Sequence, residues 1–137
     1  MSKIPFQFIK LANKCADASG KIIKKYFRKK IKINVKKDNT PYTKADCEAE
    51  KIIRELILKK EPSCGFVGEE TGAINTHNEY CWVIDPIDGT KSFITGKPTF
   101  ATLIGLLKNN KPVLGILNQP ILNERWIGIA NVETKLN

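Results

Sequence analysis

The most informative part of the sequence is residues 82–90, which read Trp82-Val83-Ile84-Asp85-Pro86-Ile87-Asp88-Gly89-Thr90. An apolar strand ends here in two carboxylates, with Pro86 between them to fix the backbone direction and Gly89 to allow a tight turn. Hard cations such as Mg²⁺ take oxygen ligands from carboxylates, backbone carbonyls and water. Asp85, the Ile87 carbonyl and Asp88 can supply such a set. Taken alone, however, an Asp-Pro-x-Asp sequence is more typical of an Asx turn before a helix.

Two further acidic positions strengthen the metal-site interpretation. Glu69 lies in Gly68-Glu69-Glu70, directly after the short apolar strand expected over residues 65–67. Two vicinal acids on a loop are commonly just solvated charges. Asp46 stands in the first turn of an expected helix, where a capping role would account for it.

Before residue 62, apolar spacing predicts two helices. In the first, over residues 5–30, apolar positions recur at steps of three and four and form one stripe: Phe8, Leu11, Cys15, Ala18, Ile22 and Tyr26. A short strand over residues 31–35 and a turn over residues 37–41 follow. The second helix begins at Thr43, whose spacing to Asp46 resembles a capping box, and Glu61-Pro62 ends it.

After residue 64 the sequence reads as strands. Apolar runs cover residues 65–67, 80–84, 100–107, 113–117 and 125–130, and Asn109-Asn110-Lys111 is a hairpin turn between two of them. Two helices followed by hairpin-linked strands predict an α+β fold, with both helices packed on one face of a largely antiparallel sheet.

Composition sets limits on location and partners. No apolar run is long enough to cross a bilayer, and residues 1–14 lack the apolar core of a secretory signal, so we expect a cytoplasmic protein with no membrane partner. The net charge is +9, and residues 21–37 hold nine Lys or Arg residues and no acid. This stretch has no nucleic-acid motif, and the chain is rich in Lys, Ile and Asn throughout. Nucleic-acid binding is therefore the weaker interpretation.

Three motifs together resemble the inositol monophosphatase superfamily. Residues 37–46 are similar to its first motif, residues 66–70 to its second, and residues 82–93 to its main signature, in the same order and at similar separations. Residues 92–105 and 124–130 look more like the histidinol-phosphatase branch than the inositol branch. The resemblance implies Mg²⁺-dependent hydrolysis of a small phosphomonoester by activated water, and the N-terminal half of an αβαβα sandwich.

The resemblance also implies a set of metal ligands for two to three Mg²⁺ ions. Glu69, Asp85 and the Ile87 carbonyl would bind the first ion, and Asp85 and Asp88 the second. Glu69, with water molecules, would hold a weaker third ion.

The remaining implied roles concern water and phosphate. Thr90 and Asp46 would orient the attacking water, so these two residues and Glu69 form the expected catalytic set. The backbone N–H groups of Gly89 and Thr90, at the start of a short helix, would bind the phosphate.

The length of the chain limits how much of the implied active site it can contain. Members of the superfamily are roughly twice as long as 137 residues, and the resemblance implies a single N-terminal metal-binding domain over residues 1–137 with the C-terminal α/β domain and its final metal-binding Asp missing. A homodimer or a complementing C-terminal chain are then the expected partners, beside a small phosphorylated metabolite. The alternatives are a non-catalytic truncated remnant and, less favoured, a basic module that binds anions or nucleic acid.

Overall fold

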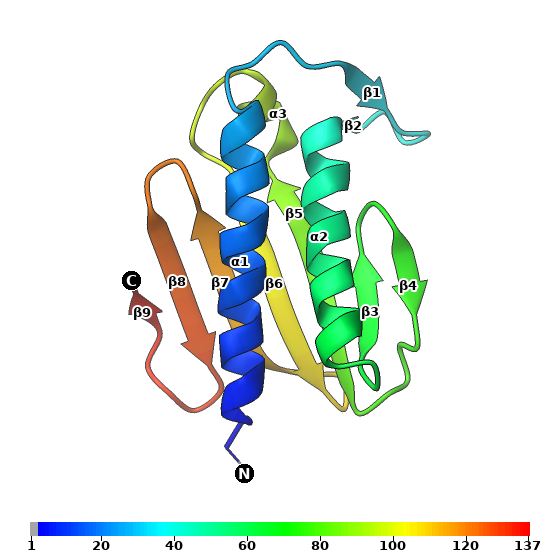
Figure 1. Cartoon of the computed structure of the whole chain (residues 1–137), viewed down its shortest axis with the longest axis vertical. Helices are drawn as coiled ribbons and strands as arrows, with labels where there is room; N and C mark the ends of the chain where they lie inside the picture. The colour runs from blue at the N-terminus through cyan, green and yellow to red at the C-terminus, as the bar shows by residue number, and fades with distance from the viewer. Residues whose placement is uncertain (1–2) are drawn as a thin grey trace.

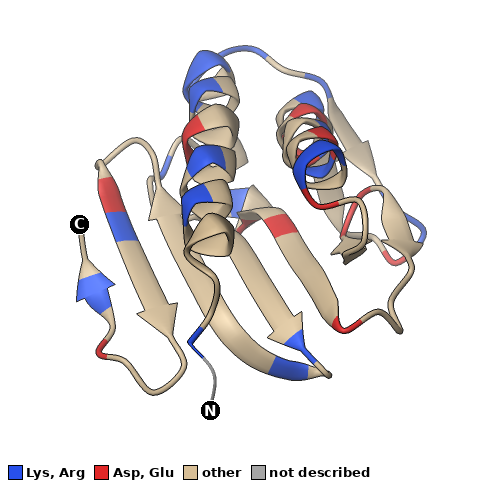
Figure 2. Ribbon diagram, turned by 60° about the horizontal axis from the view of Figure 1, so that its bottom comes forward, with Lys and Arg blue, Asp and Glu red and all other residues tan. Residues whose placement is uncertain are grey.

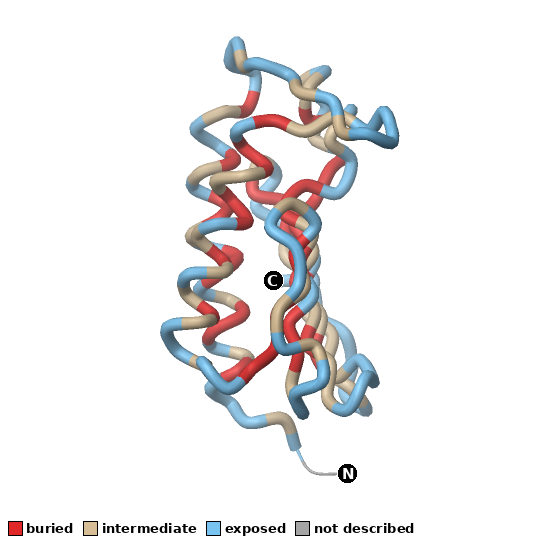
Figure 3. The backbone as a smooth tube through the Cα atoms, turned by 90° about the vertical axis from the view of Figure 1, so that its right-hand side faces the viewer, coloured by how far each residue is buried: buried red, intermediate tan, exposed pale blue. Residues whose placement is uncertain are grey.

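The structure is a computed structural model that describes residues 3–137. Two long helices lie side by side on one face of a seven-stranded sheet (Figures 1 and 3). The strand order across the sheet is β4-β3-β5-β6-β7-β8-β9. The strands are β3 (Gly65–Gly68), β4 (Gly72–Ile74), β5 (Tyr80–Asp88), β6 (Ala101–Lys108), β7 (Lys111–Gln119), β8 (Glu124–Ile129) and β9 (Lys135–Leu136). The predicted α+β class is confirmed.

All neighbouring strands of this sheet are antiparallel except β3 and β5, which run parallel. The exception arises because β4 first pairs as a hairpin with the outer edge of β3. The chain then returns along residues 75–79 before β5 joins the inner edge of β3 in the same direction. The predicted turn at Asn109 and Asn110 joins β6 to β7, with φ angles of 48° and 64°. Such positive values suit tight hairpin turns.

The helices are α1 (Phe6–Tyr26) and α2 (Lys44–Lys60). The capping box at the start of α2 is confirmed, because Thr43 accepts a hydrogen bond from the Ala45 N–H and Asp46 accepts one from the Thr43 N–H. The predicted stripe on α1 is right in its first half, where Phe8, Leu11 and Cys15 are buried, but Ala18, Ile22 and Tyr26 are only partly buried. The buried face also includes Ala12, Ala16, Ser19, Gly20 and Ile23, because α1 packs on both α2 and the sheet.

The main core fills the space between the helices and the sheet. Its largest fully buried side chains include Trp82 and Phe66 from the strands and Ile53 and Ile57 from α2. A smaller cluster lies at one end, where the rings of Phe27, Phe93 and Phe100 have centroids 5.3 to 5.9 Å apart. Phe93 belongs to the short helix α3 (Thr90–Ile94), so this cluster fixes α3 to the end of α1.

A separate hairpin of β1 (Ile33–Val35) and β2 (Pro41–Thr43) connects the two long helices (Figure 1). A strand therefore forms within the predicted range of residues 31–35, but the alternation of apolar and polar residues there does not mean burial of the apolar ones, because Ile33 and Val35 are both exposed. The strand pairs only within the hairpin and does not join the large sheet, which leaves its apolar side chains without a surface to cover them.

The face of the sheet opposite the helices carries no helix in residues 3–137 (Figure 3). Gly105, Gly115 and Gly128 are register partners across three strands, so the middle of the sheet lacks a row of side chains. Leu117 and Trp126 are register partners on β7 and β8, two positions from Gly115 and Gly128, and they are 40% and 43% exposed. None of the helices in residues 3–137 has the length and apolarity needed to span a bilayer.

Candidate functional site

The predicted site residues come from four elements that meet at one end of the sheet. Asp85, Ile87 and Asp88 lie on the last part of β5, and Glu69 directly follows β3. Because β3 and β5 are parallel, their carboxyl ends meet at the same edge (Figure 1). The start of α2, with Asp46, and the start of α3, with Thr90, reach the same end.

Asp46 is buried and uses its two oxygens for two purposes. Oδ2 accepts hydrogen bonds from the backbone N–H of Thr43 at 2.8 Å and from the Thr43 hydroxyl at 2.7 Å. Oδ1 lies 3.1 Å from the Thr90 hydroxyl. Asp46 therefore caps α2 and also contacts Thr90 of α3.

Asp85 and Glu69 form the acidic centre of the site. Burial, the charge of Glu69 and a hydrogen bond between the two carboxyl groups together raise the pKa of Asp85 to about 7, with burial the largest cause. The charge of Asp88 adds to this effect, although Asp88 itself is exposed. Two carboxyl groups can share a hydrogen bond only if one of them holds a proton, and a cation bound between them would take the place of that proton.

The donor set suits a hard cation of the Mg²⁺ type. Among residues 3–137, no three carboxylate, thiolate or imidazole side chains already form a closed metal site. Mg²⁺ does not require one, because it keeps several waters and is held by one or two carboxylates. The Ile87 carbonyl lies 3.1 Å from the Thr90 hydroxyl, and its second lone pair leaves it able to act as a ligand beside Asp85.

Gly89 connects β5 to α3 in a left-handed conformation, with φ of 92°. A Cβ at this position would lie 3.2 Å from the Thr99 carbonyl oxygen, so glycine is required on both counts. No side chain of the described residues caps α3. The first turn of α3 therefore presents Thr90 to the site without a competing side chain.

The sequence reasoning missed Lys36 and Glu70. The Lys36 ammonium lies 3.0 Å from Glu70 and 3.7 Å from Glu69. Burial acts to lower the pKa of Lys36, but its hydrogen bond to Glu70 and the charges of both glutamates outweigh burial and raise it. Lys36 lies directly before the first motif, which covers residues 37–46, so the motif did not mark it. Its partner lies 34 positions away and could not be identified from sequence.

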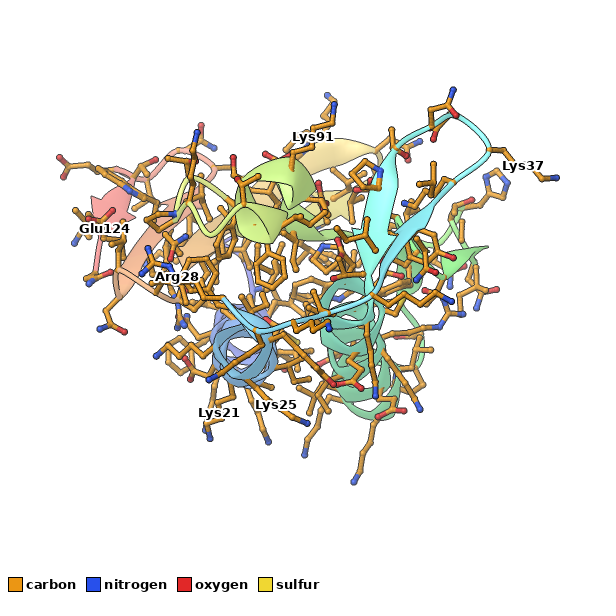
Figure 4. All side chains as sticks on the ribbon, turned by 90° about the horizontal axis from the view of Figure 1, so that it is seen from above. Lys21, Lys25, Arg28, Lys37, Lys91 and Glu124 are labelled. Atoms are coloured by element: carbon orange, nitrogen blue, oxygen red, sulfur yellow. The ribbon has the colours of Figure 1, made fainter. Side chains whose placement is uncertain are left out.

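Basic side chains surround this end of the molecule. Figure 4 looks onto it and shows Lys37 on the hairpin turn, Lys91 on α3 and Arg28 beyond the end of α1. Arg28 donates a hydrogen bond to the Gly96 carbonyl, which ties α1 to the loop after α3. Figure 2 shows further Lys and Arg residues on the outer faces of both helices, whereas the strands are mostly uncharged. A positive rim of this kind attracts anionic ligands.

Comparison with known proteins finds similar phosphatases. The chain is 53% identical over 133 residues to the chloroplastic bifunctional phosphatase IMPL2 of Arabidopsis thaliana, covering 96% of this chain and 38% of that protein. It is 41% identical to a histidinol-phosphatase of Chlorobaculum parvum, covering 86% of this chain and 46% of that one. Among solved structures, an inositol monophosphatase from Zymomonas mobilis is 42% identical with a TM-score of 0.82, covering 96% of this chain and 50% of that chain.

The chain thus spans about half the length, or less, of these relatives. The family model for inositol monophosphatases matches residues 6–137, which is nearly the whole sequence. The fold, the three motifs and this match together show that the chain belongs to the inositol monophosphatase family.

Proposed function

We propose that this chain carries the metal-binding half of a Mg²⁺-dependent phosphatase that hydrolyses a small phosphomonoester. The observation that carries the proposal is the side-chain contact between Glu69 and Asp85, because it brings two potential Mg²⁺ ligands together at the ends of two parallel strands in a chain of this family. Phosphomonoesters hydrolyse extremely slowly without catalysis, so a site for them needs strong electrostatic help.

In this proposal Glu69, Asp85, Asp88 and the Ile87 carbonyl hold two to three ions. When bound, Mg²⁺ would lower the pKa of a coordinated water and stabilise charge on the phosphoryl oxygens. The Thr90 hydroxyl donates a hydrogen bond to Asp46, which leaves a lone pair of the Thr90 oxygen free to accept a hydrogen bond from a water and so orient it.

The phosphate would lie at the start of α3. There the backbone N–H groups of Gly89 and Thr90 have no side-chain cap from the described residues and can donate to phosphoryl oxygens. The positive rim that includes Lys91 and Arg28 would increase the local concentration of an anionic substrate.

Histidinol phosphate is the first substrate to test. Residues 92–105 resemble the histidinol-phosphatase branch, and the Chlorobaculum relative bears that name. Inositol phosphate is the necessary comparison, because the Zymomonas inositol monophosphatase is equally similar.

The test is phosphate release from both substrates in millimolar Mg²⁺, using this sequence joined to the second half that its relatives possess. We expect a higher kcat/KM for histidinol phosphate, and an Asp85→Asn variant about 10²–10³-fold less active. Exchange of Lys10, a distant surface residue, for Gln is the matched control and should leave activity unchanged. Full activity in the Asp85→Asn protein would contradict the proposed site, and a clear preference for inositol phosphate would reverse the substrate order.

A further inference from the structure

Glu50 is a completely buried carboxylate on α2, with no surface exposed to solvent. Its two oxygens accept hydrogen bonds from the backbone N–H of Glu70, at 2.9 and 3.1 Å, and Oε2 accepts another from the N–H of Thr71 at 2.5 Å. A buried carboxylate is costly unless such charge-assisted bonds satisfy it. The family motifs do not include Glu50, and the proposed chemistry does not use it.

The segment that Glu50 holds is the turn that carries Glu69. A Cβ added to Gly68 would lie 2.6 Å from the Glu50 carboxyl carbon, so the backbone passes directly over this carboxylate. Arg54, one helical turn further along α2, donates a hydrogen bond to the Thr71 hydroxyl at 3.0 Å. Its guanidinium also lies 5.1 Å from the Phe66 ring centroid. Glu50 and Arg54 thus hold the turn in place from α2.

Glu69 needs such support because its own side chain is half exposed. Half of the side-chain surface is open to solvent, and Lys36 contacts it only at 3.7 Å. A mobile carboxylate loses conformational entropy when it is fixed at a cation. If the backbone on both sides is already fixed, less of that entropy remains to be lost, and the carboxylate stays close to Asp85.

We infer that Glu50, assisted by Arg54, is a positioning residue that sets the Glu69 carboxylate against Asp85 for cation binding. The inference rests on the proposed function in one respect, the assignment of Glu69 as a metal ligand. Groups that orient metal ligands through hydrogen bonds typically contribute roughly 10- to 100-fold to metal affinity.

The experiment compares Glu50→Gln with Glu55→Gln in the 137-residue chain. Glu55 lies on the same helix but is exposed, and it forms a surface ion pair with Lys51 at 4.0 Å. Three quantities are measured: thermal unfolding, hydrogen exchange of the Glu70 and Thr71 amides by NMR, and affinity for Mn²⁺ by electron paramagnetic resonance. We expect Glu50→Gln to speed exchange at both amides and to weaken Mn²⁺ binding roughly 10- to 100-fold. The Glu55→Gln protein should match the wild type.

The outcomes separate this inference from the proposed function. A folded Glu50→Gln protein with unchanged Mn²⁺ affinity overturns the inference. If Glu50→Gln does not fold, Arg54→Met replaces it and should weaken Mn²⁺ binding about 3-fold, the equivalent of one lost hydrogen bond. An Arg54→Met protein with unchanged Mn²⁺ affinity likewise overturns the inference. If the wild-type chain binds no Mn²⁺, the proposed metal chemistry is contradicted. Amide exchange then decides the inference, and unchanged exchange at Glu70 and Thr71 overturns it.

Discussion

The Thr90 hydroxyl lies 3.1 Å from Oδ1 of Asp46, although 44 positions separate these residues in the chain. The second oxygen of Asp46 closes the capping box of α2. A single buried carboxylate therefore both caps the start of α2 and contacts the first residue of α3. The start of α2 and the position of Thr90 thus depend on the same carboxylate. Substitutions of Asp46 and of Thr90 are both needed to separate what the cap and the Asp46–Thr90 contact each contribute to stability.

Replacing Asp46 by Ala should cost much more stability than replacing Thr90 by Val. Loss of a cap typically costs about 1 kcal/mol, and the buried Thr43 donors would lose their acceptor at a further cost of about 1–3 kcal/mol. Thr90→Val removes one hydroxyl and leaves the capping box intact, so we expect a loss of about 1 kcal/mol. Urea unfolding of both variants measures the difference. Equal losses would show that the cap contributes little.

Without divalent metal, the chain should become less stable as the pH rises. The pKa of Asp85 is raised to about 7 in the folded state by burial and by Glu69, from an ordinary value of 3.8. Between these values the folded state binds more protons than the unfolded state, so stability falls with rising pH and the full cost is present above pH 7. We expect an effect on the order of 1 kcal/mol, because this half-buried group is partly screened by solvent.

Urea unfolding between pH 4 and 8 tests this sign, with Asp85→Asn as the comparison. The variant should lose this part of the pH dependence and be more stable than the wild type at pH 8. Greater stability of the wild-type chain at pH 8 than at pH 5, with the variant showing the same slope, would exclude Asp85 as the cause.

The 137-residue chain by itself should be a poor phosphatase. It spans about half of its relatives, and the resemblance assigns one of the carboxylates for the second ion to the half that it does not span. Loss of a single well-placed electrostatic group costs about 10²–10³ in rate. The measurement is phosphate release from histidinol phosphate by purified residues 1–137. Turnover on the order of 1 s⁻¹ or more, as in ordinary enzymes, would contradict the prediction.

The open face of the sheet should cause self-association of this chain. Leu117 and Trp126 are partners on adjacent strands and are both exposed. Exposed apolar surfaces of this kind favour association. Sedimentation velocity should show assembly that increases with concentration, and the double variant Leu117→Ser/Trp126→Ser should reduce it. Phe6→Ser removes an equally apolar side chain, 75% exposed, from the start of α1. That control should associate like the wild type.

Two glycines should respond in opposite directions to the same substitution. A Cβ on Gly115 would meet no atom within 4 Å, so Gly115→Ala should stabilise the chain by about 0.4–1 kcal/mol through the unfolded state. A Cβ on Gly68 would lie 2.6 Å from buried Glu50 atoms, so Gly68→Ala should destabilise by about 1–3 kcal/mol. Thermal unfolding of the two variants tests the pair. Destabilisation by Gly115→Ala would mean that the open face is covered.

Local chemistry in the sequence determined the two long helices, the capping box at Thr43 and Asp46, and the hairpin turn at Asn109 and Asn110. Each depends on residues within a few positions of one another. The sequence also indicated the α+β class, because the apolar spacing changes from helical to strand-like near residue 64.

Tertiary structure alone decided the parallel pairing of β3 with β5, the ion pair of Lys36 with Glu70, and the burial of Glu50. In the sequence Glu50 is one more acid on a charged helix, since its N–H donors lie 20 and 21 positions away. Strand partners and buried charges depend on contacts between distant segments, whose free energy exists only after the chain has closed the loops between them. No pattern within a short stretch of sequence indicates which distant segments will come into contact, so these features can be seen only in the complete fold.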